Sequence, residues 1–241
     1  MAATKSKAPK NVGRTITDPS DLVAGMWKYY DVTLKFRDRC YGGIPKNPEM
    51  IRGWLEAKMG AGEETDALIV QTEGEISAAV DEAEKESWCG FKSDPENGGL
   101  YIEGRQVKAC LKESANILRE KLGISAFKAR LAERVFVTES RIYLGKNEPD
   151  GSVERPIHVM TRTGPQTALK KADYVEKAEI SFALKVVDSP MVIGSSKDRV
   201  APGAYLSVIL ELAQEMGLGA DRSQENGKFD VIYFGEMAGK N

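Results

Sequence analysis

The sequence predicts an α+β fold of the ferredoxin-like or RRM-like type, in which an antiparallel sheet has helices on one face and carries an inserted hairpin and helical segment. Apolar and polar residues alternate over residues 29–37 and 180–187, which is typical of strands. Apolar residues recur at helical spacing over 104–122 and 204–216, and a glycine follows each segment. The order strand, helix, strands, helix, strand along the chain favours this fold class.

The domain boundaries follow from composition. Residues 1–14 hold four basic residues and no acidic one, and residues 1–25 have little apolar content. We therefore expect 1–25 to form a flexible basic tail and 26–241 to form a single domain. The first strand of that domain, 29–37, places Tyr30, Val32, Leu34 and Phe36 on one face.

Between this strand and the first long helix, the sequence predicts a loop from Cys40, rich in glycine and proline, and then a short helix over 48–58. Asn47 is the expected N-cap of this helix and Pro48 its first residue. An acidic, alanine-rich insertion follows at about 61–90. Residues 61–87 hold nine acidic residues and one lysine, a local charge of −8.

The helix predicted over 104–122 carries a basic stripe. Four cations lie within about 60° of one another on the helical wheel: Arg105, Lys108, Lys112 and Arg119. An adjoining face, with Val107 and Leu111, can pack on the sheet, so we expect the stripe to face outward. Such a stripe can contact successive phosphates of a nucleic-acid strand. The alternative is an ordinary amphipathic helix with solvated lysines.

Further strands are expected at 134–143 and 156–162, with a turn at 147–151 between them and another turn at 163–166. Residues 180–187 predict a central strand, 204–216 the last helix and 228–234 the final strand. The segment between the last two elements is rich in glycine. Its residues of interest are Gly217, Gly219, Arg222, Gly227 and Lys228.

This glycine-rich segment is a candidate phosphate site. Glycines permit close backbone approach and unusual dihedral angles, and exposed amides beside an arginine and a lysine can cradle a phosphate. The segment does not match a P-loop, because no Gly-Lys-Ser/Thr follows at the required spacing. The alternative is a simple helix stop and tight turn.

Together the two segments resemble the RAMP superfamily, the ferredoxin-like proteins that form the backbone of CRISPR effector complexes. Residues 101–112, Tyr-Ile-Glu-Gly-Arg-Gln-Val-Lys-Ala-Cys-Leu-Lys, are similar to the motif in which a Tyr-Ile-Pro-Gly-Ser-Ser run leads into a basic helix. Residues 217–229 resemble the C-terminal glycine-rich signature of the family. Glu103 stands where proline is common, and Glu225 stands where the signature normally has a glycine.

The resemblance implies a protein that coats single-stranded or guide RNA as a repeated backbone subunit of a CRISPR-type or phage-borne ribonucleoprotein, and the residues discussed below predict that it is non-catalytic. It implies self-association into a filament, contact with other subunits of the complex, and a thumb-like hairpin. The best candidate hairpin is 156–176, with Arg162, Lys170 and Lys171. Two alternatives stay open, namely a phage or mobile-element structural or adaptor protein that binds protein partners, and a single-stranded DNA-binding protein. The net charge of −2 favours the adaptor.

Catalysis and cofactors are not expected. The single histidine, His158, lies in a predicted strand, and no motif supports Asp38 in the loop after the first strand as a catalytic acid. Three scattered cysteines and one histidine indicate neither a disulfide framework nor a metal site. No apolar run is long enough to cross a membrane, so we expect a cytoplasmic protein that does not bind membranes.

Overall fold

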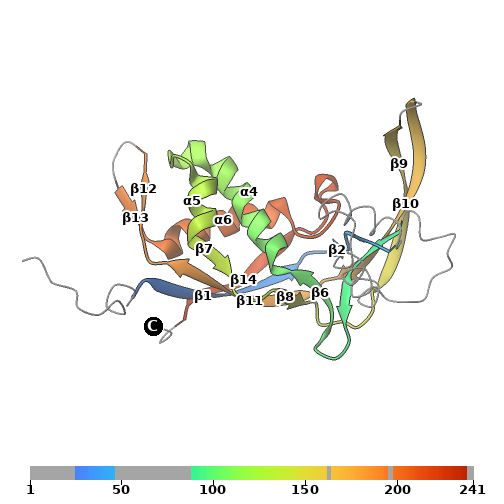
Figure 1. The fold of residues 1–241 in the computed structure, drawn as a ribbon, viewed down its shortest axis with the longest axis horizontal. Helices are drawn as coiled ribbons and strands as arrows, with labels where there is room; N and C mark the ends of the chain where they lie inside the picture. The colour runs from blue at the N-terminus through green and yellow to red at the C-terminus, as the bar shows by residue number, and fades with distance from the viewer. Residues whose placement is uncertain (1–24, 47–87, 162–163, 195–197, 238–241) are drawn as a thin grey trace, which may run out of the picture.

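A computed structural model of the protein describes residues 25–46, 88–161, 164–194 and 198–237 (Figure 1). For residues 157–161, 164–169 and 193 the description covers the course of the backbone alone. The predicted tail up to residue 24, the predicted helix over 48–58 and the acidic insertion up to residue 87 lie outside the described residues.

The central sheet has four antiparallel strands in the order β14-β1-β11-β7. They are β1 (Trp27–Phe36), β7 (Val135–Val137), β11 (Glu179–Val187) and β14 (Phe229–Glu236). Helix α4 (Gly104–Leu122) connects β1 to β7, and α6 (Pro202–Met216) connects β11 to β14. This βαββαβ succession is the ferredoxin-like arrangement, so the predicted fold class is confirmed.

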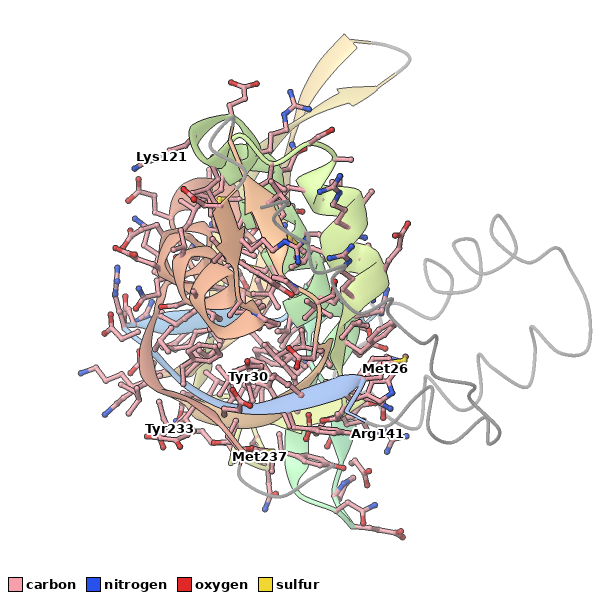
Figure 2. The ribbon with its side chains drawn as sticks, turned by 90° about the vertical axis from the view of Figure 1, so that its left-hand side faces the viewer. Met26, Tyr30, Lys121, Arg141, Tyr233 and Met237 are labelled. Atoms are coloured by element: carbon pink, nitrogen blue, oxygen red, sulfur yellow. The ribbon has the colours of Figure 1, made fainter. Side chains whose placement is uncertain are left out.

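The helices cover one face of this sheet, and a third helix, α5 (Phe127–Arg134), packs beside α4 (Figure 1). The alternation in β1 buries Tyr30, Val32, Leu34 and Phe36 beneath the helices, each with at most 3% of its surface exposed. In Figure 2 the helices lie above β1, whereas Tyr233 of β14 lies below it and is exposed. The predicted inward face of the first strand is therefore confirmed.

A long hairpin projects from one end of the molecule (Figure 1). Its strands are β9 (Gly151–Thr161) and β10 (Gly164–Glu176), and β10 also pairs with β2 (Arg39–Tyr41) and β4 (Trp88–Gly90). The predicted hairpin is confirmed and begins five residues earlier than expected, at Gly151. The turn expected at 163–166 is wrong at 164–166, which belong to β10, and Thr163 lies outside the described residues.

The remaining strands extend the hairpin sheet or form small sheets of their own. β3 (Ile44–Pro45) pairs with β4, while β5 (Lys92–Asp94), β6 (Gly99–Glu103) and β8 (Arg141–Tyr143) form a three-stranded sheet. β12 (Met191–Ile193) and β13 (Asp198–Val200) form a two-stranded ribbon.

Two further sequence predictions of local structure were wrong. The segment from Cys40, expected to be a loop, contains the end of β2 and all of β3. β3 pairs with β4, and Gly42 passes so close to β4 that a Cβ at Gly42 would lie 2.2 Å from the Gly90 carbonyl carbon. The strand expected over 134–143 is divided between α5, β7 and β8. Helix α5 escaped detection because its eight residues bury only Phe127 and Leu131, too few to show a helical period.

Candidate nucleic-acid interface

The glycine-rich segment forms a loop between α4 and the β9–β10 hairpin, and its only regular element is the 3-10 turn η2 (Arg222–Gln224) (Figure 1). Gly217, Gly219 and Gly227 have φ values of +73°, +85° and +74°. A Cβ at Gly219 would lie 2.7 Å from the carbonyl oxygen of Tyr41, and a Cβ at Gly227 would lie 1.8 Å from that of Leu218. The predicted close approach and unusual dihedral angles are confirmed, but the backbone that approaches belongs to the protein itself.

The prediction of exposed amides is wrong for much of this loop. Six of its N–H groups donate to backbone carbonyl oxygens, at Gly217, Leu218, Ala220, Gln224, Glu225 and Gly227. The acceptors belong to α6, β2 and the loop itself, so these amides fix the shape of the loop. Any anion bound here must be held mainly by side chains.

Glu225, which stands at a glycine of the family signature, keeps the backbone conformation that glycine would give. Its φ is +63° and its ψ is 17°, in the left-handed region. Asp221 has a similar conformation, with φ of +58°. The substitution at position 225 therefore leaves the turn intact and places a carboxylate at its corner.

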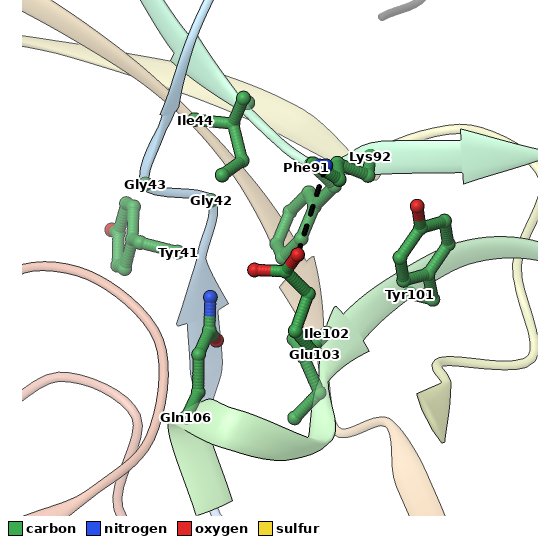
Figure 3. Close-up of a pocket in the computed structure, with 11 residues that line it drawn as sticks. Tyr41, Gly42, Gly43, Ile44, Phe91, Lys92, Tyr101, Ile102, Glu103 and Gln106 are labelled. Atoms are coloured by element: carbon green, nitrogen blue, oxygen red, sulfur yellow. Dashed lines mark ion pairs between the residues drawn. The ribbon is translucent and has the colours of Figure 1, made fainter. Parts of the chain in front are cut away.

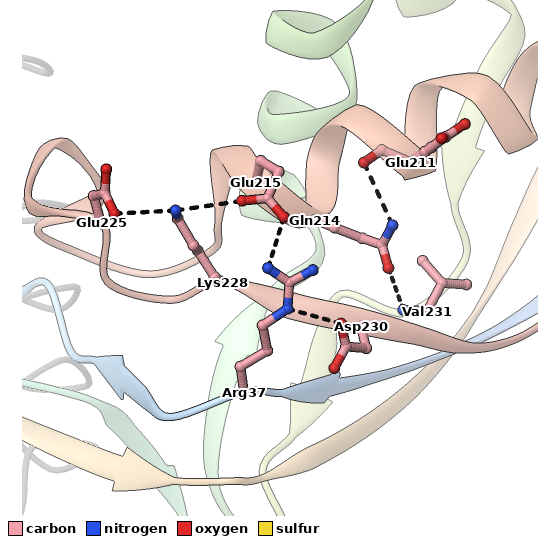
Figure 4. A network of polar contacts seen from close by, with 8 residues as sticks. All are labelled: Arg37, Glu211, Gln214, Glu215, Glu225, Lys228, Asp230 and Val231. Carbon is pink, nitrogen blue, oxygen red and sulfur yellow. Dashed lines mark hydrogen bonds and ion pairs between the residues drawn. The ribbon is translucent and has the colours of Figure 1, made fainter.

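Both predicted cations of the loop are paired with acidic residues. Arg222 donates to both oxygens of Glu113 on α4, at 2.7 and 3.4 Å, and these hydrogen bonds raise the pKa of the guanidinium. Lys228 lies 3.2 Å from Glu225 and 3.3 Å from Glu215, and hydrogen bonds to these two carboxylates raise the pKa of its ammonium group (Figure 4). Each cation is present at the predicted place but has an internal counter-charge.

The hairpin brings a further group of cations to the same loop. Lys170 lies 2.9 Å from Asp221, and Arg155 pairs with the other oxygen of that carboxylate. Lys171 lies over the ring of Trp88, 3.8 Å from its centroid. Sequence reasoning missed Arg155, which the register of β9 and β10 places directly opposite Lys170. Arg162 lies outside the described residues.

The basic stripe of α4 lies on the opposite flank of the helix from the loop. The prediction that it faces outward is wrong at Lys108, because α5 covers it: its ammonium group donates to the Ala132 carbonyl oxygen at 2.9 Å and lies 4.4 Å from the Phe136 ring centre. Burial and the charge of Lys112 lower the pKa of Lys108. Arg105 donates to Glu103 at 2.6 Å.

The outer part of this stripe borders an open hollow between α4 and α5. The hollow has a volume of about 380 Å³, and Lys112, Arg119 and Lys128 are among the side chains that line it. Arg119 is exposed and pairs with the neighbouring Glu120. We name this surface the α5 flank of α4, defined by Lys112, Arg119 and Lys128.

A second hollow, of about 310 Å³, lies between α4 and the glycine-rich loop. Its lining residues are Gly43, Gln106, Ala109, Leu218, Gly219, Ala220 and Arg222. A small pocket of about 10 Å³ adjoins it and shares Gly43 and Gln106; there Glu103 pairs with Lys92 at 3.6 Å (Figure 3). We name this surface the loop flank of α4. The two segments that carry the family resemblance, 101–112 and 217–229, thus line one hollow.

The residues considered for catalysis do not form a cluster here. Asp38 is exposed at the bend between β1 and β2, and its backbone oxygen accepts a hydrogen bond from the Lys177 amide at 2.8 Å. His158 lies in β9, and its side chain is outside the described part of the chain. Within the described ranges, no group of three or more His, Cys, Asp or Glu side chains is placed to hold a metal ion.

Comparisons with known proteins find a distant structural match. No protein-family model and no curated protein matches the sequence. A solved structure, the cryo-EM structure of the Type III-B Cmr-beta bound to cognate target RNA, contains a chain that matches with a TM-score of 0.47 and 13% identity. The alignment covers 90% of this protein and 63% of that chain, so this protein spans less than two thirds of its length. No helix in the described part of this protein is long and apolar enough to span a membrane.

Proposed function

We propose that this protein binds single-stranded RNA as a RAMP-like backbone subunit of a CRISPR-type or phage-borne ribonucleoprotein, and that it catalyses no reaction itself. The observation that carries the proposal is the convergence of residues 101–112 and 217–229 on the loop flank of α4. These two segments carry the family resemblance and lie more than 100 residues apart in the sequence. The βαββαβ topology places the start of α4 and the loop before β14 at the same end of the sheet, so the support for the proposal is that both segments carry the family resemblance there.

The loop flank has the chemistry that a phosphate backbone requires. Gly43 and Gly219 line the hollow without side chains, which allows a polynucleotide strand to approach closely. Arg222 borders the same hollow, and Lys170 reaches the loop from the hairpin. Many aromatic side chains of the described residues are buried or pack against another ring, so we expect binding through phosphates with little sequence preference.

The α5 flank offers a second group of cations. Lys112 and Lys128 have no ion pair with any described residue, whereas Arg222 and Lys228 both do. A strand that contacts both flanks would cross α4. The two groups of cations therefore need to be tested separately.

The test is the binding of a labelled single-stranded RNA of about 30 nucleotides at two salt concentrations. We expect Arg222→Gln/Lys228→Gln to weaken binding about tenfold and to reduce the salt slope by about 0.7 for each lost phosphate contact. Lys121→Gln/Arg199→Gln removes the same charge from exposed positions outside the loop, at the end of α4 and in β13, and serves as the matched control. Equal losses in both double variants would contradict the proposed site.

The matching single-stranded DNA separates the remaining possibilities. Preference for RNA supports the proposal, and equal or tighter binding to DNA would point to a single-stranded DNA-binding protein. If the wild type binds neither, the RNA-binding function is wrong and protein partners should be sought. Coating of the strand by repeated subunits predicts that a 60-nucleotide RNA binds about twice as many copies as a 30-nucleotide RNA, which native mass spectrometry can count.

A further inference from the structure

Two cations at the base of the hairpin share one carboxylate. Arg155 of β9 and Lys170 of β10 stand directly opposite each other in the hairpin register. Like charges in this position repel each other and destabilise a hairpin unless an anion lies between them. In this structure that anion is Asp221 of the glycine-rich loop, which pairs with Lys170 at 2.9 Å and with Arg155.

We infer that Arg155 and Lys170 form a binding site for a phosphodiester group, and that the Asp221 carboxylate occupies this site in the absence of RNA. The inference rests on the proposed function and extends it, since it adds Arg155 to the interface and assigns Asp221 an opposing role. A carboxylate and a phosphodiester both present two acceptor oxygens, and an arginine with a lysine can bind either.

The charges favour exchange of the carboxylate for a phosphate. Two cations and one carboxylate leave a net charge of +1, so the site retains an attraction for anions when Asp221 is in place. The Asp221 side chain is 14% exposed, so its ion pairs with Arg155 and Lys170 are mostly buried but still reach solvent. Its two neighbours in the chain, Ala220 and Arg222, line the hollow of the loop flank, so a strand in the hollow lies next to the site.

Arg155 has contacts besides Asp221. Gln224 accepts a hydrogen bond from Arg155, whose guanidinium also lies 5.9 Å from the centre of the Tyr41 ring. The backbone of Lys170 is fixed by the pairing of β9 with β10, and its ammonium group pairs with Asp221. The frame of the loop is held separately, by hydrogen bonds from the Leu218 amide to Gly227 and from the Gly227 amide to Arg39. Movement of Asp221 therefore leaves the Arg155 guanidinium held by its other contacts, with Lys170 opposite it in the hairpin register.

A purely structural salt bridge makes the opposite prediction. If Asp221 only fastens the loop to the hairpin, its removal should loosen the site and weaken RNA binding. If Asp221 competes with phosphate, its removal should strengthen binding. The sign of the change in affinity therefore separates the two roles.

The experiment compares Asp221→Asn and Asp221→Gly with wild type in the full chain. Both replacements suit a residue with φ of +58°, because asparagine and glycine adopt the left-handed conformation readily, so both variants should fold. Glu179→Gln removes one negative charge from an exposed position at the start of β11 and controls for net charge. The probes are the 30-nucleotide RNA at several salt concentrations and inorganic phosphate, whose binding is read from the shift in Tm.

We expect both Asp221 variants to bind RNA about three- to tenfold more tightly than Glu179→Gln, with a salt slope steeper by about 0.7 for one added phosphate contact. Adding Arg155→Gln/Lys170→Gln should abolish this gain. Phosphate should raise the Tm of the Asp221 variants more than that of wild type at equal ionic strength.

Unchanged or weaker binding in both Asp221 variants, together with no added effect of phosphate, would overturn the inference. The proposed function can fail separately. If phosphate stabilises the Asp221 variants through Arg155 and Lys170 but no form of the protein binds RNA, the anion site is real and the RNA-binding function is wrong.

Discussion

The two flanks of α4 carry cations in different states. On the loop flank, Arg222 pairs with Glu113 and the nearby Lys228 pairs with two glutamates. On the α5 flank, Lys112 and Lys128 border an open hollow and form no ion pair with a described residue. The first flank is built around an internally neutralised loop, and the second exposes its charge to solvent.

This difference shows that the number of cations on a flank does not by itself determine how many of them are available to bind phosphate. A cation with an internal carboxylate must exchange that partner for a phosphate, so it contributes less affinity than an equally exposed free cation. Its position, however, is fixed before binding. We therefore expect the loop flank to determine where a strand lies and the α5 flank to contribute attraction that depends more strongly on salt.

The largest expected effect is a loss of stability caused by distorting the glycine-rich loop. Gly227→Ala places a Cβ 1.8 Å from the Leu218 carbonyl oxygen at a φ of +74°, so the loop must move. We expect a loss of about 3 kcal/mol in the free energy of unfolding, measured with urea. Gly145→Ala is the matched control, since Gly145 has φ of +71° with no atom within 4 Å of the added Cβ. It should lose only about 1 kcal/mol, and equal losses would show that the close approach is unimportant.

The next prediction tests which cations of the basic stripe on α4 contribute to the stability of the fold. Lys108→Glu replaces an ammonium group that donates to Ala132 and lies over Phe136 with a carboxylate, which both groups repel. We expect the free energy of unfolding to fall by about 2 kcal/mol. Lys112→Glu, one turn away, should change it by less than about 0.5 kcal/mol while still weakening RNA binding. A similar loss of stability in both variants would mean that α5 does not distinguish the two lysines.

A third prediction uses two thiols buried beneath the loop. Gly219 packs over Cys40, and the Cys110 thiol donates to the Gly217 carbonyl oxygen at 3.4 Å. Burial raises the pKa of each thiol from its ordinary value of 9.0 to about 12. Between these values the folded protein holds protons that the unfolded chain releases, so stability should fall as the pH rises above about 9.

Each of these thiols should reduce the free energy of unfolding by about 1.4 kcal/mol at pH 10 relative to neutral pH. Urea unfolding of wild type and of Cys40→Ala/Cys110→Ala, each at pH 8 and pH 10, measures this contribution. The double variant should lose less stability between the two pH values than wild type does. Identical losses would show that the thiols are not shielded beneath the loop.

Much of the fold could be predicted from the sequence because its main elements have strong local patterns. The alternation in β1, and the apolar spacing of α4 with Gly123 at its end, depend on residues close together in the chain. β2 and β3 could not be found this way, because a contact between Gly42 and a residue 48 positions later defines their course. Short elements that are stabilised by distant pairing carry little local pattern.

The candidate site was predictable in its residues but not in its electrostatics. The glycines of the loop and the cations Arg222 and Lys228 were identified from their spacing. Their acidic partners were not, because Glu113 and Glu215 lie on helices whose orientation toward the loop only the tertiary structure sets. Arg155 was missed for a related reason, since its role depends on the hairpin register.

The smallest expected effect concerns Glu225 and has the opposite sign. Its left-handed conformation costs a residue with a side chain about 1 kcal/mol relative to glycine, and its pairing with Lys228 at 3.2 Å is exposed and contributes little. We therefore expect Glu225→Gly to raise the free energy of unfolding by about 0.5 to 1 kcal/mol. It should also strengthen RNA binding slightly, since Lys228 loses one of its two carboxylate partners.

Glu225→Gln, which keeps the backbone strain and removes the charge, should strengthen binding without the gain in stability. If Glu225→Gly is less stable than wild type, the pairing with Lys228 outweighs the backbone strain, and the loop flank depends on its internal charges for folding.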